Sequence, residues 1–182
     1  MQWTYPRAEP WLAPRPATGS WLWQGAVGGI FAGLIFLLFE MLMAAVTRDP
    51  QAFLLPPRTI ATLVLGSTAL DPGVSLPTVI GLGLGIHLVI SAILGALFGL
   101  VVSGIPAVGR SSAAVVVLAS AYGLAIWIVN LFLIAPLMGG PRAVVQLEPA
   151  IQVIAHSVFF GTTLGLHLAQ AMIAQPEPVP NW

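Results

Sequence analysis

Four polar residues stand inside apolar stretches of this sequence, where they could do chemistry: Glu40, His87, Asn130 and His156. A carboxyl group, two imidazoles and a carboxamide can exchange protons, hydrogen bond a polar head group, or bind an ion. If Glu40 is ionised it needs a cationic partner, for which the loop residues Arg58 and Arg142 or a histidine are candidates. If it is protonated it donates a hydrogen bond. The structural alternative is a buried Glu–His–Asn–His network that only fixes the register of the helices.

The spacing of these residues predicts that they meet. Glu40 follows Gly33 by seven residues and Asn130 follows Gly123 by seven, which is nearly two helical turns, so each pair shares a helix face. Glu40 and Asn130 lie near the ends of their apolar stretches, and the two histidines lie about two turns inside theirs. Because alternate stretches leave and enter at one face of a membrane, we expect the four side chains to converge at a similar depth.

The composition decides which elements position these residues. Of 182 residues, 58% are hydrophobic and 7% are charged, with a mean hydropathy of +0.96; soluble domains carry about a quarter charged residues. A membrane-spanning helix needs about 20 apolar residues, and four stretches qualify, at about 24–46, 79–103, 112–134 and 149–173. The apolar segment 59–70 is only half a span long, which favours an interfacial or re-entrant helix. We therefore predict an all-α integral membrane protein with a bundle of four transmembrane helices.

The flanking segments and the missing residue types narrow the classes of function. Residues 1–20 form a Pro- and Trp-rich arm, 21–174 the membrane domain, and 175–182 a short tail, with Trp21 and Trp23 as interfacial anchors. The net charge is zero, which leaves no basic surface for nucleic acid. The sequence has no cysteine. It shows no phosphate cradle, no Ser-His-Asp set and no pair of nearby catalytic carboxylates, so we expect no enzyme activity and no metal site.

Small residues recur at steps of four in the first, second and fourth predicted spans, where they form a seam along one helix face. The third span has a shorter seam of the same kind. Such seams let membrane helices approach closely. They predict either a compact bundle or one whose seams partly face other subunits. The predicted packing residues are Gly25, Gly29, Gly33, Gly83, Ser91, Gly95, Gly99, Gly123, Gly161 and Gly165.

The two halves of the chain align as a degenerate repeat of two helical hairpins. GLIFLLFE (33–40) matches GLAIWIVN (123–130), and LPPR (55–58) matches GGPR (139–142). HLVISAILG (87–95) matches HSVFFGTTLG (156–165) with a slip of one residue. Such a repeat relates the halves by an axis along the membrane normal.

The order of these motifs resembles the YagU-like group of small bacterial inner-membrane proteins. The resemblance rests on a Gly-rich first span ending in Glu40, H-x3-S-x3-G-x3-G from His87, YG-x3-W at 122–127, and H-x4-G-x3-G from His156. It covers roughly residues 25–169. It implies a four-helix protein of the bacterial cytoplasmic membrane and no particular activity.

Three functional hypotheses remain open at this point. The first is a non-catalytic accessory subunit of a larger bacterial membrane complex, energy-transducing (respiratory or photosynthetic electron transport), with other membrane subunits and lipid as partners and no cofactor of its own. The second is a small transporter or proton or ion pathway that uses the Glu/His/Asn cluster. The third is a b-type haem or quinone protein, with His87 and His156 as the haem ligands.

Overall fold

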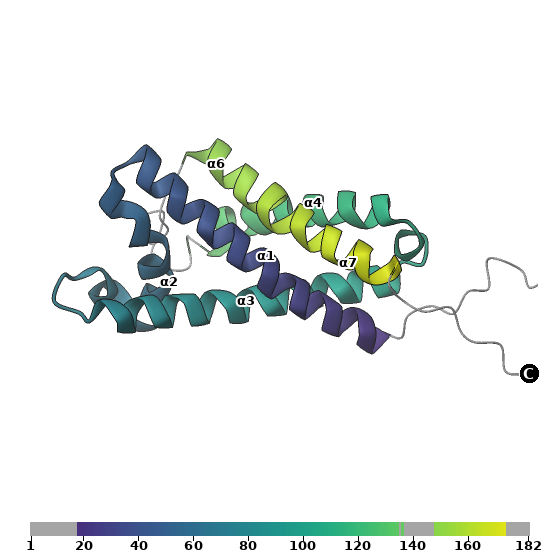
Figure 1. Ribbon diagram of the computed structural model, residues 1–182, viewed down its shortest axis with the longest axis horizontal. Helices are drawn as coiled ribbons and strands as arrows, with labels where there is room; N and C mark the ends of the chain where they lie inside the picture. Colours follow the sequence, from purple (N-terminus) through teal and green to yellow (C-terminus); the bar gives the residue numbers. More distant parts are fainter. Residues whose placement is uncertain (1–17, 135, 137–147, 174–182) are drawn as a thin grey trace, which may run out of the picture.

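The computed structural model describes residues 18–134, 136 and 148–173. Every regular element in this part of the chain is helical. The long helices are α1 (Thr18–Thr47), α3 (Leu76–Gly104) and α4 (Ser112–Val129). A fourth rod is continuous through α6 (Pro149–Ile154), the π-helix η7 (Ala155–Thr162) and α7 (Thr163–Ile173). In Figure 1, α1 runs diagonally across α3, and α6–α7 lies on the other side of α1.

Five helical segments of the described chain are long and apolar enough to cross a membrane, judged by length and composition. The prediction of an all-helical protein with several such helices is thereby confirmed, whereas the count of four is not. The five segments are Thr18–Thr47, Pro50–Leu70, Leu76–Gly104, Ser112–Ile134 and Pro149–Met172. The extra segment contains the predicted half-span 59–70, joined to the residues before it.

That extra segment is not one straight helix. It consists of the 3-10 turn η2 (Pro50–Leu54), α2 (Leu55–Leu65) and the 3-10 turn η3 (Gly66–Leu70). Asp49 starts it by accepting hydrogen bonds from the amides of Gln51 and Ala52. Gly66, at a φ of 62°, ends α2, because the left-handed region is open to glycine at little cost.

The segment folds back on itself after Gly66. The Arg58 guanidinium donates from Nε to the carbonyl of Ala69 and from Nη2 to that of Asp71, both at 3.1 Å. A straight helix would separate residues 58 and 69 by about 16 Å along its axis. The chain therefore returns to the end of the bundle where α1 finishes and begins α3 there.

Glycine contacts set the antiparallel pairing of α1 with α3. A Cβ on Gly25 would clash with the backbone of Gly95, and one on Gly29 would clash with the backbones of Ser91 and Gly95. Gly99 meets the Trp21 carbonyl in the same way. The backbones touch because no side chain lies between them, which is how small residues hold helices together where lipid supplies no hydrophobic drive.

The second hairpin, α4 with η7 and α7, packs by the same device. Gly123 lies against the His156 carbonyl, Gly161 against Ala119, and Gly165 against Val116. Gly83 uses its missing side chain differently, because it admits the Pro57 carbonyl of α2. All ten residues named above as packing positions lie at close contacts within this chain.

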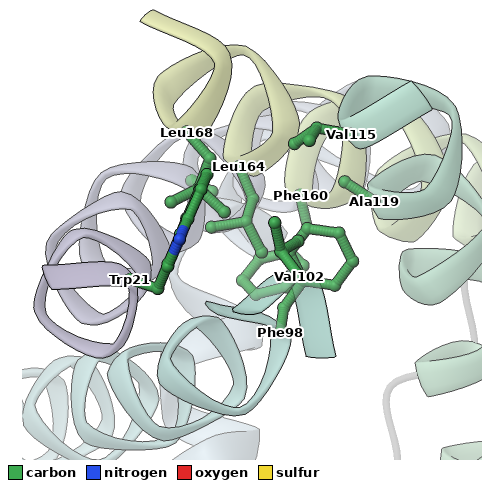
Figure 2. Close-up of a cluster of buried hydrophobic side chains, with 9 residues drawn as sticks. Trp21, Phe98, Val102, Val115, Ala119, Phe160, Leu164 and Leu168 are labelled. Carbon is green, nitrogen blue, oxygen red and sulfur yellow. The ribbon is translucent and has the colours of Figure 1, made fainter. Parts of the chain in front are cut away.

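The apolar core gathers at the end of the bundle that holds the start of α1 and the end of α3 (Figure 2). Phe98, Leu164 and Leu168 are completely buried there. Trp21 is 5% exposed, so it belongs to this core, while Trp23 is 65% exposed. The pairing of these two residues as interfacial anchors is therefore wrong for Trp21, because α1 begins at Thr18, earlier than residue 24, and turns that indole inward.

Two π-helices depart from the regular α-helices that the sequence predicted. One is η5 (Asn130–Ile134), at the end of α4, and the other is η7. A π-turn accommodates one extra residue without breaking the helix. The second π-helix covers the place where HSVFFGTTLG runs one residue longer than HLVISAILG. The slip in that alignment has a physical counterpart there, although the repeat itself is not confirmed.

Candidate functional site

A cavity of about 260 Å³ lies between the helices and adjoins the apolar core, with which it shares Phe160. The four residues singled out in the sequence all line it: Glu40, His87, Asn130 and His156. They come from α1, α3, η5 and η7, so every rod of the bundle supplies one. Both π-helices place residues on its wall, and π-turns inside helices frequently mark functional sites.

Glu40 is the acidic residue of the cavity and is 9% exposed. Its carboxyl oxygen Oε1 accepts a hydrogen bond from the Gln152 amide at 2.7 Å. The two residues are 112 positions apart in the chain, so this bond ties α1 to α6. The sequence reading missed Gln152, although it precedes His156 by four residues and therefore lies on the same helix face.

The two histidines are oriented by backbone carbonyl groups. Nε2 of His87 donates to the Gly33 carbonyl at 2.9 Å, and Nδ1 of His156 donates to the Gln152 carbonyl at 3.0 Å. Because a carbonyl oxygen can only accept, these bonds fix which ring nitrogen carries the proton in the neutral form. The Ser91 hydroxyl lies 3.5 Å from His87 Nε2, at the limit of hydrogen bonding.

Phe36 packs against both imidazoles. Its ring is stacked on His87 with centroids 5.6 Å apart and meets the edge of His156 at 4.7 Å. A macrocycle ligated by both histidines would have to displace this ring. Among the described residues, no group of three or more His, Cys, Asp or Glu is placed to hold a metal ion.

The loop arginines do not join the cluster as predicted. Arg58 donates to the backbone carbonyls after α2, which stabilises the turn rather than the Glu40 carboxylate. Arg142 lies outside the described residues, as do most of the arm at 1–20 and the tail at 175–182. Across the part of the chain that is described, Glu40 has no ion pair, and its hydrogen bond comes from the neutral Gln152.

The remaining wall of the cavity is apolar. It includes residues of the folded-back segment, which the sequence had not connected with the polar cluster. These apolar or weakly polar residues are Phe36, Pro56, Thr59, Ile60, Leu63, Ile90, Leu94, Ile126, Ile134 and Phe160. The site thus combines one buried acid, two oriented imidazoles and two carboxamides with an otherwise mainly apolar wall.

Comparison of the chain with family models, with curated proteins and with solved structures finds no match. The resemblance to the YagU-like group therefore stays a prediction. Function has to be argued from the cavity.

Proposed function

We propose that this chain is a small multi-pass membrane protein that moves protons, or a solute exchanged for protons, through the cavity around Glu40. One observation carries the proposal: a buried carboxyl group and two oriented imidazoles line a cavity inside a bundle of apolar helices. Ionisable groups inside membrane segments are costly and typically mark ion or proton pathways. The resemblance to the YagU-like group is the basis for placing the protein in the bacterial cytoplasmic membrane, which is part of the proposal.

The proposal includes a membrane topology of four crossings and one re-entrant segment. The α1–α3 pairing is antiparallel along both helices, so the end of α1 and the start of α3 share one side. Helix α2 has 11 residues, about 16 Å of length against a hydrocarbon core of about 30 Å. Pro50–Leu70 therefore enters and leaves at one face, and carries α2 to the cavity.

The topology has a direct test in single-cysteine variants, since the sequence contains no cysteine. Asp49→Cys and Gly73→Cys flank the re-entrant segment. A membrane-impermeant thiol reagent should label both from the same side of sealed vesicles. Labelling from opposite sides would mean that Pro50–Leu70 crosses the membrane.

The two hairpins support the proposed repeat, because equivalent residues make equivalent contacts. Gly29 meets Ser91 and Gly95 in the first hairpin, and Ala119 meets Gly161 and Gly165 in the second. The π-helix in η7 absorbs the one residue by which the second copy is longer. A cavity between two such hairpins is where transporters with internal repeats place their substrate sites.

The functional test is proton flux into vesicles reconstituted with the purified protein. A potassium diffusion potential drives the protons, and a trapped pH-sensitive dye reports them. We expect flux above that of protein-free vesicles for the natural protein, and its loss in Glu40→Gln. Glu148→Gln makes the same chemical change at an exposed position that begins α6 and should keep the flux. Equal flux in both variants would refute the proposal.

The accessory-subunit hypothesis stays a separate prediction. It used the glycine seams as docking faces, whereas the ten seam positions pack within the chain. Its test is purification after mild detergent extraction. Copurification with larger subunits at fixed stoichiometry would support it, and an absorption spectrum of the same sample would reveal a b-type haem.

A further inference from the structure

The hydrogen bonds of the two imidazoles leave each ring with one acceptor nitrogen. A neutral imidazole carries one N–H, and both histidines give theirs to backbone carbonyls, His87 to Gly33 and His156 to Gln152. The other nitrogen of each ring is therefore an acceptor. The Gln152 amide donates to Glu40. A ligand that meets these groups needs to bring hydrogen-bond donors.

The acidic group of the cavity also has no complementary positive charge among the described residues. The Glu40 carboxyl group is 9% exposed, and within the described chain no arginine or histidine nitrogen lies at ion-pair distance from it. A buried carboxylate with no cation is strongly disfavoured, and pairing removes much of that cost. The complementary charge can come from a proton or from a cationic ligand, which makes the two competitors for one site.

The rest of the wall matches an apolar body of modest size. Phe36 and Phe160 contribute aromatic rings to the wall, and Ile60 and Leu63 of α2 contribute aliphatic side chains. Cations bind favourably over aromatic faces when they are desolvated. A cavity of about 150 Å³ holds one benzene molecule, so about 260 Å³ admits a ring with a short charged arm.

We propose that the cavity binds an organic ammonium ion with a small apolar body, its N–H groups directed at Glu40 and at the acceptor nitrogen of His156. Binding to the protonated acid releases one proton: the carboxyl O–H is lost as the carboxylate pairs with the ammonium group. The inference rests on the proposed function and names its solute. A quinone carbonyl could not accept a hydrogen bond from either imidazole, because both ring N–H groups are given to backbone carbonyls.

Competition with protons gives the site a pH dependence with a defined sign. Lowering the pH protonates Glu40 and expels the amine; raising it favours the amine. His87 of α3 and His156 of η7 are the other titratable groups on the wall, and charging them would also repel an ammonium ion. Arg58 of α2 is held by backbone carbonyls after the helix.

Equilibrium binding of radiolabelled benzylammonium to the purified protein tests the proposal. We expect binding by the natural protein and by Glu148→Gln, and at least a tenfold loss in Glu40→Gln. Benzyl alcohol has the same shape without the charge and should compete at least tenfold more weakly. Affinity should rise between about pH 5 and about pH 8 in the natural protein and stay flatter in Glu40→Gln.

Three results would overturn the inference: no binding of benzylammonium, equal binding by Glu40→Gln, or equal competition by benzyl alcohol. Should Glu40→Gln fail to fold, the amine and alcohol comparison on the natural protein decides alone. Failure here is distinguishable from failure of the proposed function. Proton flux that depends on Glu40, without amine binding, would leave the pathway standing and remove only the ammonium ligand.

Discussion

The two ends of this helical bundle are formed by the same helices but differ in how their interiors are packed. At one end, Trp21, Phe98 and Leu168 are buried in one apolar cluster (Figure 2). At the other end the interior is hollow, and Glu40, His87 and His156 line the space. In Figure 1 the hollow end is the one where α2 and α6 lie.

The difference comes from what stands at the helix contacts. Glycines at the packed end bring the backbones of α1 and α3 into direct contact, which leaves little space between these helices. Toward the hollow end the contact residues change from Gly29 to the pair of Gly33 and His87, and π-turns reshape the facing helices. Close packing stabilises one end, and the other end holds the cavity on which the proposed function rests.

The largest expected effect is a break of the packed end at Gly95. In Gly95→Leu the new side chain meets the backbones of Gly25 and Gly29, so α1 and α3 must separate. We expect loss of the monodisperse folded protein on size-exclusion chromatography. Gly85→Leu is the matched control on the same helix, because a Cβ there meets nothing within 4 Å. If both variants behave alike, the glycine contacts do not hold the bundle.

Truncation of the packed core should cost less. Phe98→Ala leaves a cavity among fully buried side chains. Lipid is as apolar as the core, so the cost comes mainly from lost packing contacts, and we expect about 2 kcal/mol of unfolding free energy. Leu97→Ala, at a position 48% exposed, should change it by less than about 0.5 kcal/mol. Denaturant titration in detergent measures both.

At the hollow end, Gln152→Leu should lower both proton flux and stability. The change removes the donor to Glu40. Hydrogen bonds to charged groups contribute about 1.5–3 kcal/mol, so we expect proton flux to fall about tenfold. The free energy of unfolding should fall by about 1–3 kcal/mol, because the buried Glu40 carboxyl group loses its donor. Gln170→Leu, on the exposed face of α7, should leave flux unchanged. Unaltered flux in Gln152→Leu would show that this bond is idle.

The smallest effect concerns an unsatisfied group at the packed end. Nε2 of His167 is buried without a hydrogen-bond partner among the described residues, and its ring lies against Gly28. A buried polar atom without a partner costs about 1–3 kcal/mol. We expect His167→Leu to raise the midpoint of thermal unfolding slightly and to keep proton flux. A lower midpoint would mean that this imidazole contributes to packing.

The helices and the shared layer of polar residues could be predicted from the sequence, because both depend on local pattern. Runs of apolar residues predicted the rods, and the steps from Gly33 to Glu40 and from Gly123 to Asn130 pointed to one shared layer. The cavity itself could not be predicted, since it depends on how four helices fit and on the fold-back of α2. Nothing local marks Arg58 as the residue that closes that turn.

Two features of the site, Gln152 and the π-turn beside His156, have a recognisable signal in the sequence. Gln152 stands one helical turn before His156, which places it beside the cluster. The one-residue slip between the two histidine segments indicated a π-turn, because an inserted residue is absorbed that way without breaking a helix. The identity of the partner of Glu40 then followed only from the three-dimensional pairing of α1 with α6.

The central claim is that Glu40 and Gln152 meet inside the bundle, and paired cysteines test it most directly. The double variant Glu40→Cys/Gln152→Cys should cross-link in native membranes with a short bifunctional thiol reagent. The control variant Leu38→Cys/Ile154→Cys carries its cysteines at exposed positions of the same two helices, 52% and 45% exposed in the natural protein. It should not cross-link. Cross-linking of the second pair without the first would contradict the account.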